Sequence, residues 1–505
     1  MYSDKRNIQQ LAALLQAHGV EDIVVCPGSR NAALVHTFSQ MGSMRCRSVT
    51  DERSAGFQAI GLSLATDRPV AVCITSGSAV ANVHPAVCEA FYQGVPLVVI
   101  SADRPQAWIG QMDGQTMPQQ GVFGPMVRRS VSLPEVHTAE NDWHCNRLIN
   151  EALLEATHGT GGPVHINVPV SEPFYEFHTP ELPPVRVIRR TADVSSLARR
   201  FAQASRPMIV VGQYPRPLRQ LPKGCVMVSE QLGNQREGIR GDLDNLIASI
   251  PENEKKAYVP DLVISLGGHL VSKCMKAFLR GNAPREHWDV NGRSEVRDMF
   301  QCLTTIVECG EEELLDALDA QGADHAFTKR WNALALKLKT EGESVVGSLI
   351  RLLPEGAVLH LANSSAVRMA EHHRIRPDVT VCCNRGINGI EGSTSTAVGY
   401  ALAHPERPNY LITGDLAFFY DQNALWSQPM PQNLHILLLN NGGGGIFDRL
   451  PLPQDERSQA FIRGRHTTSA EPVCRQYGVR YLQGEERMKD FAESREAVVL
   501  EIKTT

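Results

Sequence analysis

The sequence has no apolar run that could cross a membrane. Its longest apolar stretches, such as residues 95–100, are far shorter than the roughly 20 residues that a bilayer-spanning helix needs. Residues 1–7 are mostly polar and lack the apolar core of a signal peptide. We therefore expect a cytoplasmic protein that has no membrane partner.

The sequence also lacks C-x-x-C pairs and an excess of positively charged residues. The 12 cysteines include no C-x-x-C pair, which favours reduced thiols in the core over zinc ligands or disulfides. The 50 Lys and Arg residues are outnumbered by 55 Asp and Glu residues, so no global positive field indicates a nucleic-acid partner. The sequence contains no P-loop, G-x-S-x-G or H-E-x-x-H element either.

The composition is that of a folded soluble protein, with 42% hydrophobic and 21% charged residues. At 505 residues the chain exceeds one ordinary hydrophobic core, and about three domains are expected. Short apolar runs alternate with helical stretches, which is typical of parallel sheets with crossover helices. We predict an α/β fold of three domains, each with a mainly parallel sheet flanked by helices, over residues 1–180, 181–345 and 346–505.

Each predicted domain contains several predicted strands. In the first block they are residues 23–26, 70–75, 97–101 and 162–169, with helices at 8–18, 53–65 and 79–92. In the central block, which is predicted to be Rossmann-like, they are residues 208–211, 226–228, 262–266 and 305–307. In the third block they are residues 358–361, 379–383, 410–413, 436–439 and 498–502. Prolines between residues 173 and 184 indicate a linker, and residues 311–343 form a charged helical stretch.

Two loops of the third block follow predicted strands and carry oxygen ligands. Gly414-Asp415 follows strand 410–413, and Asn440-Asn441-Gly442-Gly443 follows the next strand. Because the carboxyl ends of parallel strands meet at one edge of a sheet, the two loops should lie together. A carboxylate, an amide oxygen and a backbone carbonyl suit a magnesium ion that holds a diphosphate, and glycines let the backbone approach phosphates. Taken alone, either loop could be an ordinary strand-end turn.

This pair of loops resembles the signature of the thiamine-diphosphate-dependent enzymes, usually written G-D-G followed by N-N. Leu416 replaces the glycine at the third position of G-D-G, as in the menaquinone-pathway synthases of that superfamily. The resemblance implies thiamine diphosphate as cofactor and Mg²⁺ or Mn²⁺ as metal. The implied metal ligands are Asp415, Asn441 and the carbonyl of Gly443, and Leu416 and Ala417 would lie beside the cofactor.

The same signature requires a glutamate after an early strand of the first domain. Glu52 lies at that place and opens a predicted helix. By the resemblance, its carboxylate would bind N1′ of the cofactor's pyrimidine and favour the imino tautomer, whose nitrogen removes the C2 proton. The alternative is that Glu52 is only a helix-N-terminal acid favoured by the helix dipole.

Four arginines follow predicted strands at the same sheet edges. They are Arg30 in P-G-S-R, Arg104 in A-D-R-P, Arg368, and Arg385 in N-R-G-I-N-G-I-E-G. Arginine pairs bidentately with carboxylates, so four arginines at one cleft would indicate a substrate with several negative charges. Pairing with a surface acid is the alternative for each one.

Together with T-S-G-S-A-V-A-N at residues 75–82, these elements resemble the 2-succinyl-5-enolpyruvyl-6-hydroxy-3-cyclohexene-1-carboxylate (SEPHCHC) synthases of menaquinone biosynthesis. The resemblance covers most of the first and third blocks and little of the central one. It implies a transferase that decarboxylates 2-oxoglutarate and adds the succinyl unit to isochorismate in a 1,4-addition, releasing CO₂.

The resemblance also assigns residues. The isochorismate side would contain Ser29, Arg30, Arg104, Gln115 and Lys273, and the 2-oxoglutarate side Asn363, Ser364, Arg368 and Arg385. Ile390 would support the cofactor below its thiazolium ring, and Ile446, Phe447 and Leu450 would form an apolar wall. The implied catalytic residues are Glu52, Ser29, Gln115 and Arg385, with the proton shuttle left open among Ser29, Gln115 and water. Cys274 stands where a second basic residue is expected after Lys273.

Glu52 and Asp415 fall in different predicted domains. By the resemblance, the first domain of one chain meets the third domain of another, in a homodimer or homotetramer. Two other functions remain open: another thiamine-diphosphate-dependent carboligase or decarboxylase, such as an acetolactate synthase that carries FAD, and a non-catalytic paralogue that binds the cofactor. The number of arginines favours dicarboxylate substrates over pyruvate.

Overall fold

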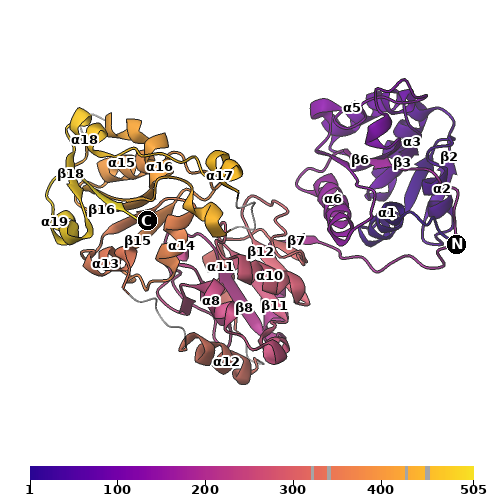
Figure 1. Ribbon diagram of the computed structural model, residues 1–505. Coiled ribbons are helices and arrows are strands. Elements are labelled where there is room, and N and C mark those ends of the chain that lie inside the picture. The colour runs from indigo at the N-terminus through magenta and orange to yellow at the C-terminus, as the bar shows by residue number, and fades with distance from the viewer. Residues whose placement is uncertain (320–322, 338–342, 427–429, 450–454, 505) are drawn as a thin grey trace. The chain divides into compact units, whose positions relative to one another are not determined.

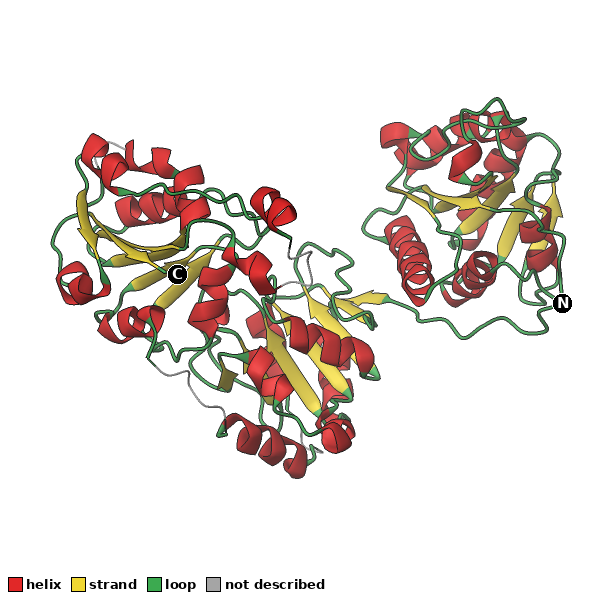
Figure 2. Ribbon diagram, viewed as in Figure 1, coloured by secondary structure: helices red, strands yellow, loops and turns green. Residues whose placement is uncertain are grey.

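The computed structural model describes residues 1–319, 323–337, 343–426, 430–449 and 455–504 (Figure 1). Among these residues the chain forms three sheets flanked by helices, and the strand pairs of known register are all parallel (Figure 2). This confirms the predicted α/β fold. The chain divides into two compact units, Met1–Thr191 with Ser294–Ile306, and Ala192–Arg293 with Val307–Thr505. The domain boundaries at residues 180 and 345 stay predictions.

The first unit contains a six-stranded sheet in the order β2-β1-β3-β4-β6-β5. Its strands are β1 (Asp22–Val25), β2 (Arg45–Ser48), β3 (Val70–Ile74), β4 (Leu97–Asp103), β5 (Arg129–Ser132) and β6 (Val164–Pro169). Its helices are α1 (Arg6–Ala17), α2 (Ala32–Ser39), α3 (Glu52–Thr66), α4 (Ser78–Asn82), α5 (His84–Gln93) and α6 (Ala139–Thr157). One core joins the sheet to α1, α2 and α6, and another joins it to α3, α4 and α5.

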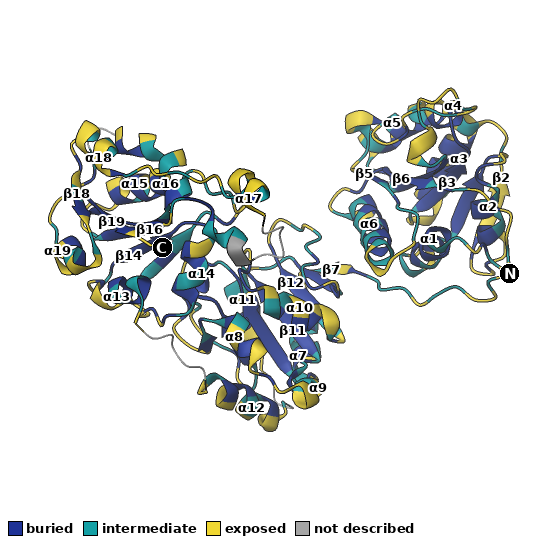
Figure 3. Ribbon diagram, viewed as in Figure 1, coloured by how far each residue is buried: buried dark blue, intermediate teal, exposed yellow. Residues whose placement is uncertain are grey.

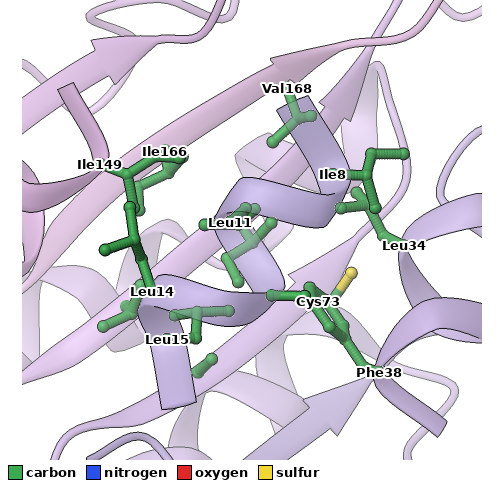
Figure 4. Close-up of a cluster of buried hydrophobic side chains, with 14 of the residues drawn as sticks. Ile8, Leu11, Leu14, Leu15, Leu34, Phe38, Cys73, Ile149, Ile166 and Val168 are labelled. Carbon is green, nitrogen blue, oxygen red and sulfur yellow. The ribbon is translucent and has the colours of Figure 1, made fainter. Parts of the chain in front are cut away.

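The core beneath α1 follows from the helical spacing of its apolar side chains. Ile8, Leu11 and Leu15 are fully buried, and they pack in the same cluster as the strand residues Cys73 and Ile166 (Figure 4). Burying one such aliphatic side chain stabilises the fold by about 1.5–3 kcal/mol. Gly19 follows the helix with a φ of 80°, which confirms that the helix ends there.

The single helix predicted over residues 79–92 is wrong, because the structure contains two helices that meet at Val83. Pro85 stands in the first turn of α5. Proline has no N–H group, and its ring clashes with the carbonyl of the residue four positions earlier, so a helix cannot run through it without a break. The proline marked this boundary in the sequence, although the apolar periodicity on both sides concealed it.

The proline-rich segment after β6 has the irregular backbone expected of a linker. It also packs against the first unit. Phe174 is buried, and Phe177 and Leu182 contact the core beneath α1 and α2. An isolated bridge joins Thr179 to Tyr2. The segment therefore covers the first core besides connecting two sheets.

In the central sheet, five neighbouring strands lie in the order β10-β9-β8-β11-β12. Its strands are β8 (Pro207–Val211), β9 (Val226–Ser229), β10 (Ile239–Arg240), β11 (Leu262–Leu266) and β12 (Glu286–Val290), and the chain passes between the two units at β7 (Arg189–Thr191) and β13 (Thr305–Val307). The helices are α7 (Val194–Ala202), α8 (Leu243–Ala248), α9 (Lys255–Tyr258), α10 (Lys273–Gly281), α11 (Glu311–Ala317) and α12 (His325–Ala335).

The third sheet has the order β15-β14-β16-β17-β19-β18, which repeats the order of the first sheet strand for strand. Its strands are β14 (Val358–Leu361), β15 (Thr380–Cys383), β16 (Asn409–Gly414), β17 (Leu434–Asn440), β18 (Arg480–Gln483) and β19 (Val498–Lys503). Its helices are α13 (Val345–Leu352), α14 (Ser365–Glu371), α15 (Ser393–Ala403), α16 (Asp415–Tyr420), α17 (Glu456–Ile462), α18 (Glu471–Tyr477) and α19 (Met488–Ala492). The central strands of all three sheets are buried (Figure 3).

Side-chain amides of the central sheet pair with the backbone of β15, the edge strand of the third sheet. Asn234 Oδ1 accepts the N–H of Val381 at 2.7 Å, and its Nδ2 donates to the carbonyl of the same residue at 3.0 Å. Gln213 Nε2 donates to the carbonyl of Cys383 at 2.7 Å. These bonds fix the central sheet against the third one.

Among the helices that the structure describes, none combines the length and the apolar character of a membrane-spanning segment.

Candidate functional site

Asp415 links the two oxygen-bearing loops at the carboxyl edge of the third sheet. Its carboxylate is 3% exposed and lies at the start of α16. Oδ1 accepts the N–H of Leu416 at 2.7 Å, and Oδ2 accepts the N–H of Gly443 at 2.9 Å. The carboxylate therefore holds the glycine loop after β17 against the loop after β16, as the strand order predicts.

The glycine loop has no room for side chains at two positions. A Cβ atom on Gly443, whose φ is 152°, would lie 2.9 Å from the carbonyl oxygen of Arg463, and one on Gly442 would lie 3.0 Å from that of His466. Backbone hydrogen bonds run in both directions between these segments, from His466 to Gly442 and from Gly444 to Arg463. Glycine is required here because of both the backbone conformation and the close approach of the neighbouring chain.

The two consecutive asparagines of this loop have different environments. Asn440 is buried, and its Nδ2 donates to Glu501 Oε1 at 2.6 Å and to the carbonyl of Thr468 at 2.9 Å. Asn441 is exposed. Burial would raise the pKa of Glu501, but hydrogen bonds from Tyr481, Asn440 and Ser469 outweigh it and lower that pKa. Asn440 is therefore held inside the fold, while Asn441 is accessible to a ligand.

Asn363 organises the loop that follows β15. Its Nδ2 donates to the carbonyls of Asn384 at 2.7 Å and Gly389 at 2.6 Å, and its Oδ1 accepts Nη1 of Arg385 at 2.8 Å. Arg385 is 7% exposed, and its Nε has no hydrogen-bond partner among the described residues. A buried donor left unpaired costs free energy, so this N–H group is well suited to receive a ligand oxygen.

Ser364 is the residue before α14, and Arg368 lies within that helix. Ser364 has a φ of 73°, a strained conformation for a residue with a side chain, which costs about 1–3 kcal/mol and is often found at functional sites. Arg368 Nη1 donates to the carbonyl of Ser364 at 2.6 Å. The arginine thus supports the strained turn that precedes its own helix.

The apolar residues assigned to the cofactor lie around these loops. Ile390 is half-buried and packs against the core of the third sheet, and Ala417 is buried. Leu416 and Ile446 are half-buried. The ring of Phe447, likewise half-buried, lies so close to Gly444 that a Cβ atom there would be 2.6 Å away from it. Leu450 lies outside the residues that the structure describes.

In the first unit, Glu52 is the first residue of α3 and is half-buried. Oε2 accepts Nδ2 of Asn82 at 3.1 Å. Asp51 caps the helix by accepting the N–H of Ser54 at 3.1 Å, so Glu52 itself is not needed as the cap. Burial first, and the negative charge of Glu52 second, raise the pKa of the Cys26 thiol to about 12, which places the carboxylate near the end of β1.

The two arginines of the first unit have partners within that unit. Arg30 is 5% exposed, and its Nη1 donates to the carbonyl of Val170 at 3.1 Å while its guanidinium lies 4.6 Å from the ring centre of Phe174. Arg104 Nε lies 3.0 Å from Asp113 Oδ2 and donates to the carbonyl of Gly114. Any anionic ligand of these arginines would share them with the existing partners.

Ser29 and Gln115 are both exposed at the same sheet edge. Gln115 has a φ of 54°, and its backbone would lie 3.2 Å from a Cβ atom on Gly77. Sequence reasoning missed Gln119, which is 1% exposed and connects the loop after β3 to strands β4 and β6. Its Oε1 accepts the N–H of Gly77 at 2.8 Å, and its Nε2 donates to Asn167 Oδ1 at 2.8 Å. No motif identifies this glutamine, because it lies in a segment without periodicity.

Lys273 is the first residue of α10 and is exposed, with no partner among the described residues. Cys274 is half-buried, and its backbone N–H donates to Asp244 Oδ1 at 2.9 Å. Burial raises the pKa of the Cys274 thiol, and the nearby carboxylate of Asp244 raises it further. This thiol is therefore neutral near pH 7 and does not replace a basic residue.

Each unit thus gathers its own part of the predicted site. The loops after β14 to β17 bring together residues 363–368, 385–390, 415–417 and 441–447, and the loops after β1, β2 and β4 carry Ser29, Arg30, Glu52 and Arg104. No group of three or more His, Cys, Asp and Glu side chains that could hold a metal occurs in the described part of the chain. Oxygen ligands for a metal would therefore come from one carboxylate with an amide and a backbone carbonyl.

Known families match both site-bearing sheets. Residues 6–125 match the thiamine pyrophosphate enzyme N-terminal TPP binding domain, and residues 363–503 match the C-terminal TPP binding domain. A 2-succinyl-5-enolpyruvyl-6-hydroxy-3-cyclohexene-1-carboxylate synthase of Phocaeicola vulgatus is 50% identical over 97% of this chain and 92% of its own length. Synthases of the same name are 48% identical in Bacteroides fragilis, over 100% of this chain and 97% of theirs, and 47% in Bacteroides thetaiotaomicron, over 98% and 94%. The chain therefore belongs to the SEPHCHC synthase family of thiamine-diphosphate-dependent enzymes.

Proposed function

We propose that the chain decarboxylates 2-oxoglutarate and adds the resulting succinyl unit to isochorismate in a 1,4-addition, giving SEPHCHC and CO₂. The observation that carries this proposal is the similarity to synthases of that name over nearly the whole chain. The unpaired Nε of Arg385 supports it, since both substrates are dicarboxylates.

The residues at the edge of the third sheet fit a metal-diphosphate group. Each oxygen of Asp415 accepts one backbone N–H, and Oδ2 also lies 3.2 Å from His466 Nε2, so Oδ1 is the oxygen with a lone pair left for a metal. The Gly443 carbonyl accepts the N–H of Gly445 at 3.0 Å and has a second lone pair, in a loop that a side chain would obstruct. We infer that Asp415, Asn441 and the Gly443 carbonyl hold Mg²⁺ or Mn²⁺, both of which prefer such oxygen ligands.

When bound, thiamine diphosphate supplies the nucleophilic carbon and the electron sink for decarboxylation. Glu52 would hold a proton at the pyrimidine N1′ position, and Asn82 keeps its carboxylate oriented. Ile390 would support the cofactor ring from the core of the third sheet. Leu416 and Ala417 open α16 beside the diphosphate, while Ile446 and Phe447 supply apolar wall.

The substrate carboxylates would be bound from both sheets. Arg385, through its unpaired Nε, and Arg368 would bind 2-oxoglutarate beside Asn363 and Ser364. Lys273, Arg30 and Arg104 would bind isochorismate. Ser29 and Gln115 are exposed at the same edge and are the side-chain candidates for moving protons during the addition.

Apolar side chains exposed on the site-bearing helices support a shared active site. On α3, Phe57 is 43% and Leu64 is 62% exposed, and on α15 and α16, Leu402 is 46% and Tyr420 is 72% exposed. These side chains are available for a contact with another chain. We infer a homodimer or homotetramer in which Glu52 of one chain serves the metal-diphosphate site of another.

Two experiments test these proposals. Mass spectrometry of the products from 2-oxoglutarate and isochorismate should detect SEPHCHC. If the cofactor binds but no adduct forms, the proposed substrates are wrong. Formation of acetolactate from pyruvate would instead indicate an acetolactate synthase, and cofactor binding without CO₂ release would indicate a non-catalytic paralogue. For the shared site, Glu52→Gln chains mixed with Asp415→Ala chains should recover activity, whereas no recovery under exchanging conditions would contradict it.

A further inference from the structure

The turn before α10 is held by an unusual number of side chains. Glu230 Oε2 accepts the N–H of Val271 at 2.7 Å, and Oε1 accepts the N–H of Ser272. The hydroxyl of Ser272 caps α10 by accepting the N–H of Met275 at 3.0 Å and donates to Asp244. One buried carboxylate therefore fixes two consecutive backbone amides directly before Lys273.

Two further contacts complete the constraint. Asp244 Oδ1 accepts the N–H of Cys274 at 2.9 Å, and Lys276 Nζ donates to the carbonyl of Leu270 at 2.8 Å. Within the described residues, the Lys273 ammonium itself has no partner. The backbone that carries this unpaired cation is already fixed, so only the lysine side chain loses freedom when an anion binds.

Glu230 also connects this turn to the third sheet. The next residue, Gln231, donates its N–H to both carboxylate oxygens of Glu371, at 2.9 and 3.2 Å, and its Nε2 donates to the carbonyl of His373 at 2.8 Å. Glu371 is the last residue of α14, which also carries Arg368. Hydrogen bonds thus join α14 to Gln231 and join its covalent neighbour Glu230 to the turn that bears Lys273.

The carboxylates of Glu230 and Glu371 are both buried, and burying a charged carboxylate costs free energy. Burial raises the pKa of Glu230, and the backbone bonds from Val271 and Ser272 and the charges of Lys276 and Arg385 oppose that rise. Burial, together with the neighbouring charge of Glu230, raises the pKa of Glu371 well above its ordinary value. The Glu230 carboxylate thus bonds directly to the turn before Lys273, and the charge of Arg385 also acts on it.

We propose that Glu230 is a positioning residue for recognition of the carboxylate-bearing acceptor. It fixes the turn that presents Lys273 and holds that turn at a constant position relative to α14. The inference rests on the proposed function, and it makes the central sheet part of the acceptor site. A purely structural Glu230 would instead stabilise the contact between two sheets and affect both substrates alike.

The test is the Glu230→Gln variant of the full-length chain with thiamine diphosphate and Mg²⁺. Glutamine keeps the shape but can accept only one of the two N–H groups. We expect KM for isochorismate to rise about tenfold, while kcat, KM for 2-oxoglutarate and cofactor affinity change by less than about threefold. Glu252→Gln, at a side chain that is 85% exposed in the same part of the chain, is the matched control and should match the wild type.

A double-mutant cycle determines whether Glu230 acts through Lys273. Lys273→Ala alone should raise KM for isochorismate, and adding Glu230→Gln should raise it little further, because the lysine that Glu230 positions is already gone. If Glu230→Gln folds poorly, Glu230→Asp keeps the charge and should give an intermediate KM. Hydrogen–deuterium exchange should show faster exchange over residues 270–274 in the variant.

Three outcomes would overturn the inference: equal effects on both substrates, fully additive effects in the cycle, or unchanged exchange over residues 270–274. If the wild type forms no adduct from isochorismate, the proposed function fails and the acceptor role of Glu230 fails with it. If the wild type forms the adduct but Glu230→Gln does not raise KM for isochorismate selectively, only the positioning role of Glu230 is wrong. The two failures are therefore distinguishable.

Discussion

The first and third sheets have the same strand order, yet their site residues are held very differently. At the edge of the third sheet, Asp415, Asn363 and Arg385 are buried and connected by hydrogen bonds between loops. At the edge of the first sheet, Arg30 is also buried and bonded, but Glu52 is half-buried with one side-chain partner and Ser29 is exposed. The same strand order thus supports two kinds of site edge. The edge of the third sheet, the prebuilt half, holds charged groups in place by hydrogen bonds. The edge of the first sheet, the accessible half, is open enough for the pyrimidine ring of the cofactor to enter.

The largest effect should come from breaking the prebuilt half. Asp415→Ala removes the carboxylate and leaves the N–H groups of Leu416 and Gly443 without their acceptor. We expect no saturable binding of thiamine diphosphate with Mg²⁺ by calorimetry, and no measurable turnover. Asp490→Asn, at an exposed position of α19, is the control and should bind normally. Cofactor binding that survives Asp415→Ala would contradict the proposed metal ligand.

Breaking the accessible half should slow catalysis without preventing binding. Glu52→Gln keeps the hydrogen bond to Asn82 possible but removes the charge, and loss of such a proton-holding group costs about 100-fold or more in kcat. Cofactor affinity, measured by calorimetry, should stay within about threefold of the wild type. A Glu52→Gln variant with normal kcat would exclude the activating role.

A smaller effect should come from the glycine loop. Gly443→Ala places a Cβ atom 2.9 Å from the Arg463 carbonyl, so the loop must shift, and we expect cofactor affinity to fall about tenfold to 100-fold. Gly356→Ala is the matched control, because Gly356 also has a positive φ, of 69°, but no atom within 4 Å of the new Cβ. Equal effects of the two substitutions would mean that backbone strain, not crowding, governs the loop.

The smallest effect concerns the pH dependence of stability. It compares one buried histidine of the first sheet with one of the third sheet. Burial lowers the pKa of His165 on β6 to about 3 and that of His360 on β14 to about 4. The unfolded chain binds protons at these sites below its ordinary pKa of about 6.5, so stability is lost as pH falls from 6.5 towards the folded values. Each histidine should cost about 1.4 kcal/mol of unfolding free energy at pH 5.5 relative to pH 7.

Urea unfolding of His165→Gln and His360→Gln at the two pH values measures these losses. Each variant should lose less stability on acidification than the wild type. His137→Gln, at an exposed position, should behave as the wild type does. An unchanged pH response in His360→Gln would show that this ring is already charged in the folded chain.

Most of the fold could be predicted because its strands are short, apolar and buried. The predicted strands at residues 262–266 and 358–361 coincide with β11 and β14. Strand β2 was missed, because Arg45–Ser48 is polar and exposed throughout and has no apolar signal. Strand β12 was missed because Glu286, His287 and Asp289 interrupt its apolar residues, and only tertiary hydrogen bonds such as that from Ser265 to Asp289 make such a strand favourable.

The family and the cofactor were predictable from motifs, and both are confirmed. The individual site roles stay predictions. Glu230 and Gln119 could not be found from the sequence, because each acts on backbone groups far away along the chain. Contacts of this kind depend on which loops the fold brings together, and neither periodicity nor a motif records them.

Asn234 and Gln213 close the open edge of the third sheet with side-chain amides, as a further strand would do with its backbone. A fragment that began at Val345 would leave the N–H and C=O groups of β15 free to pair with another copy, which is a common route to aggregation. The shortest fragment suitable for cofactor-binding studies should therefore begin before β8, even though the proposed metal ligands lie some 200 residues further on.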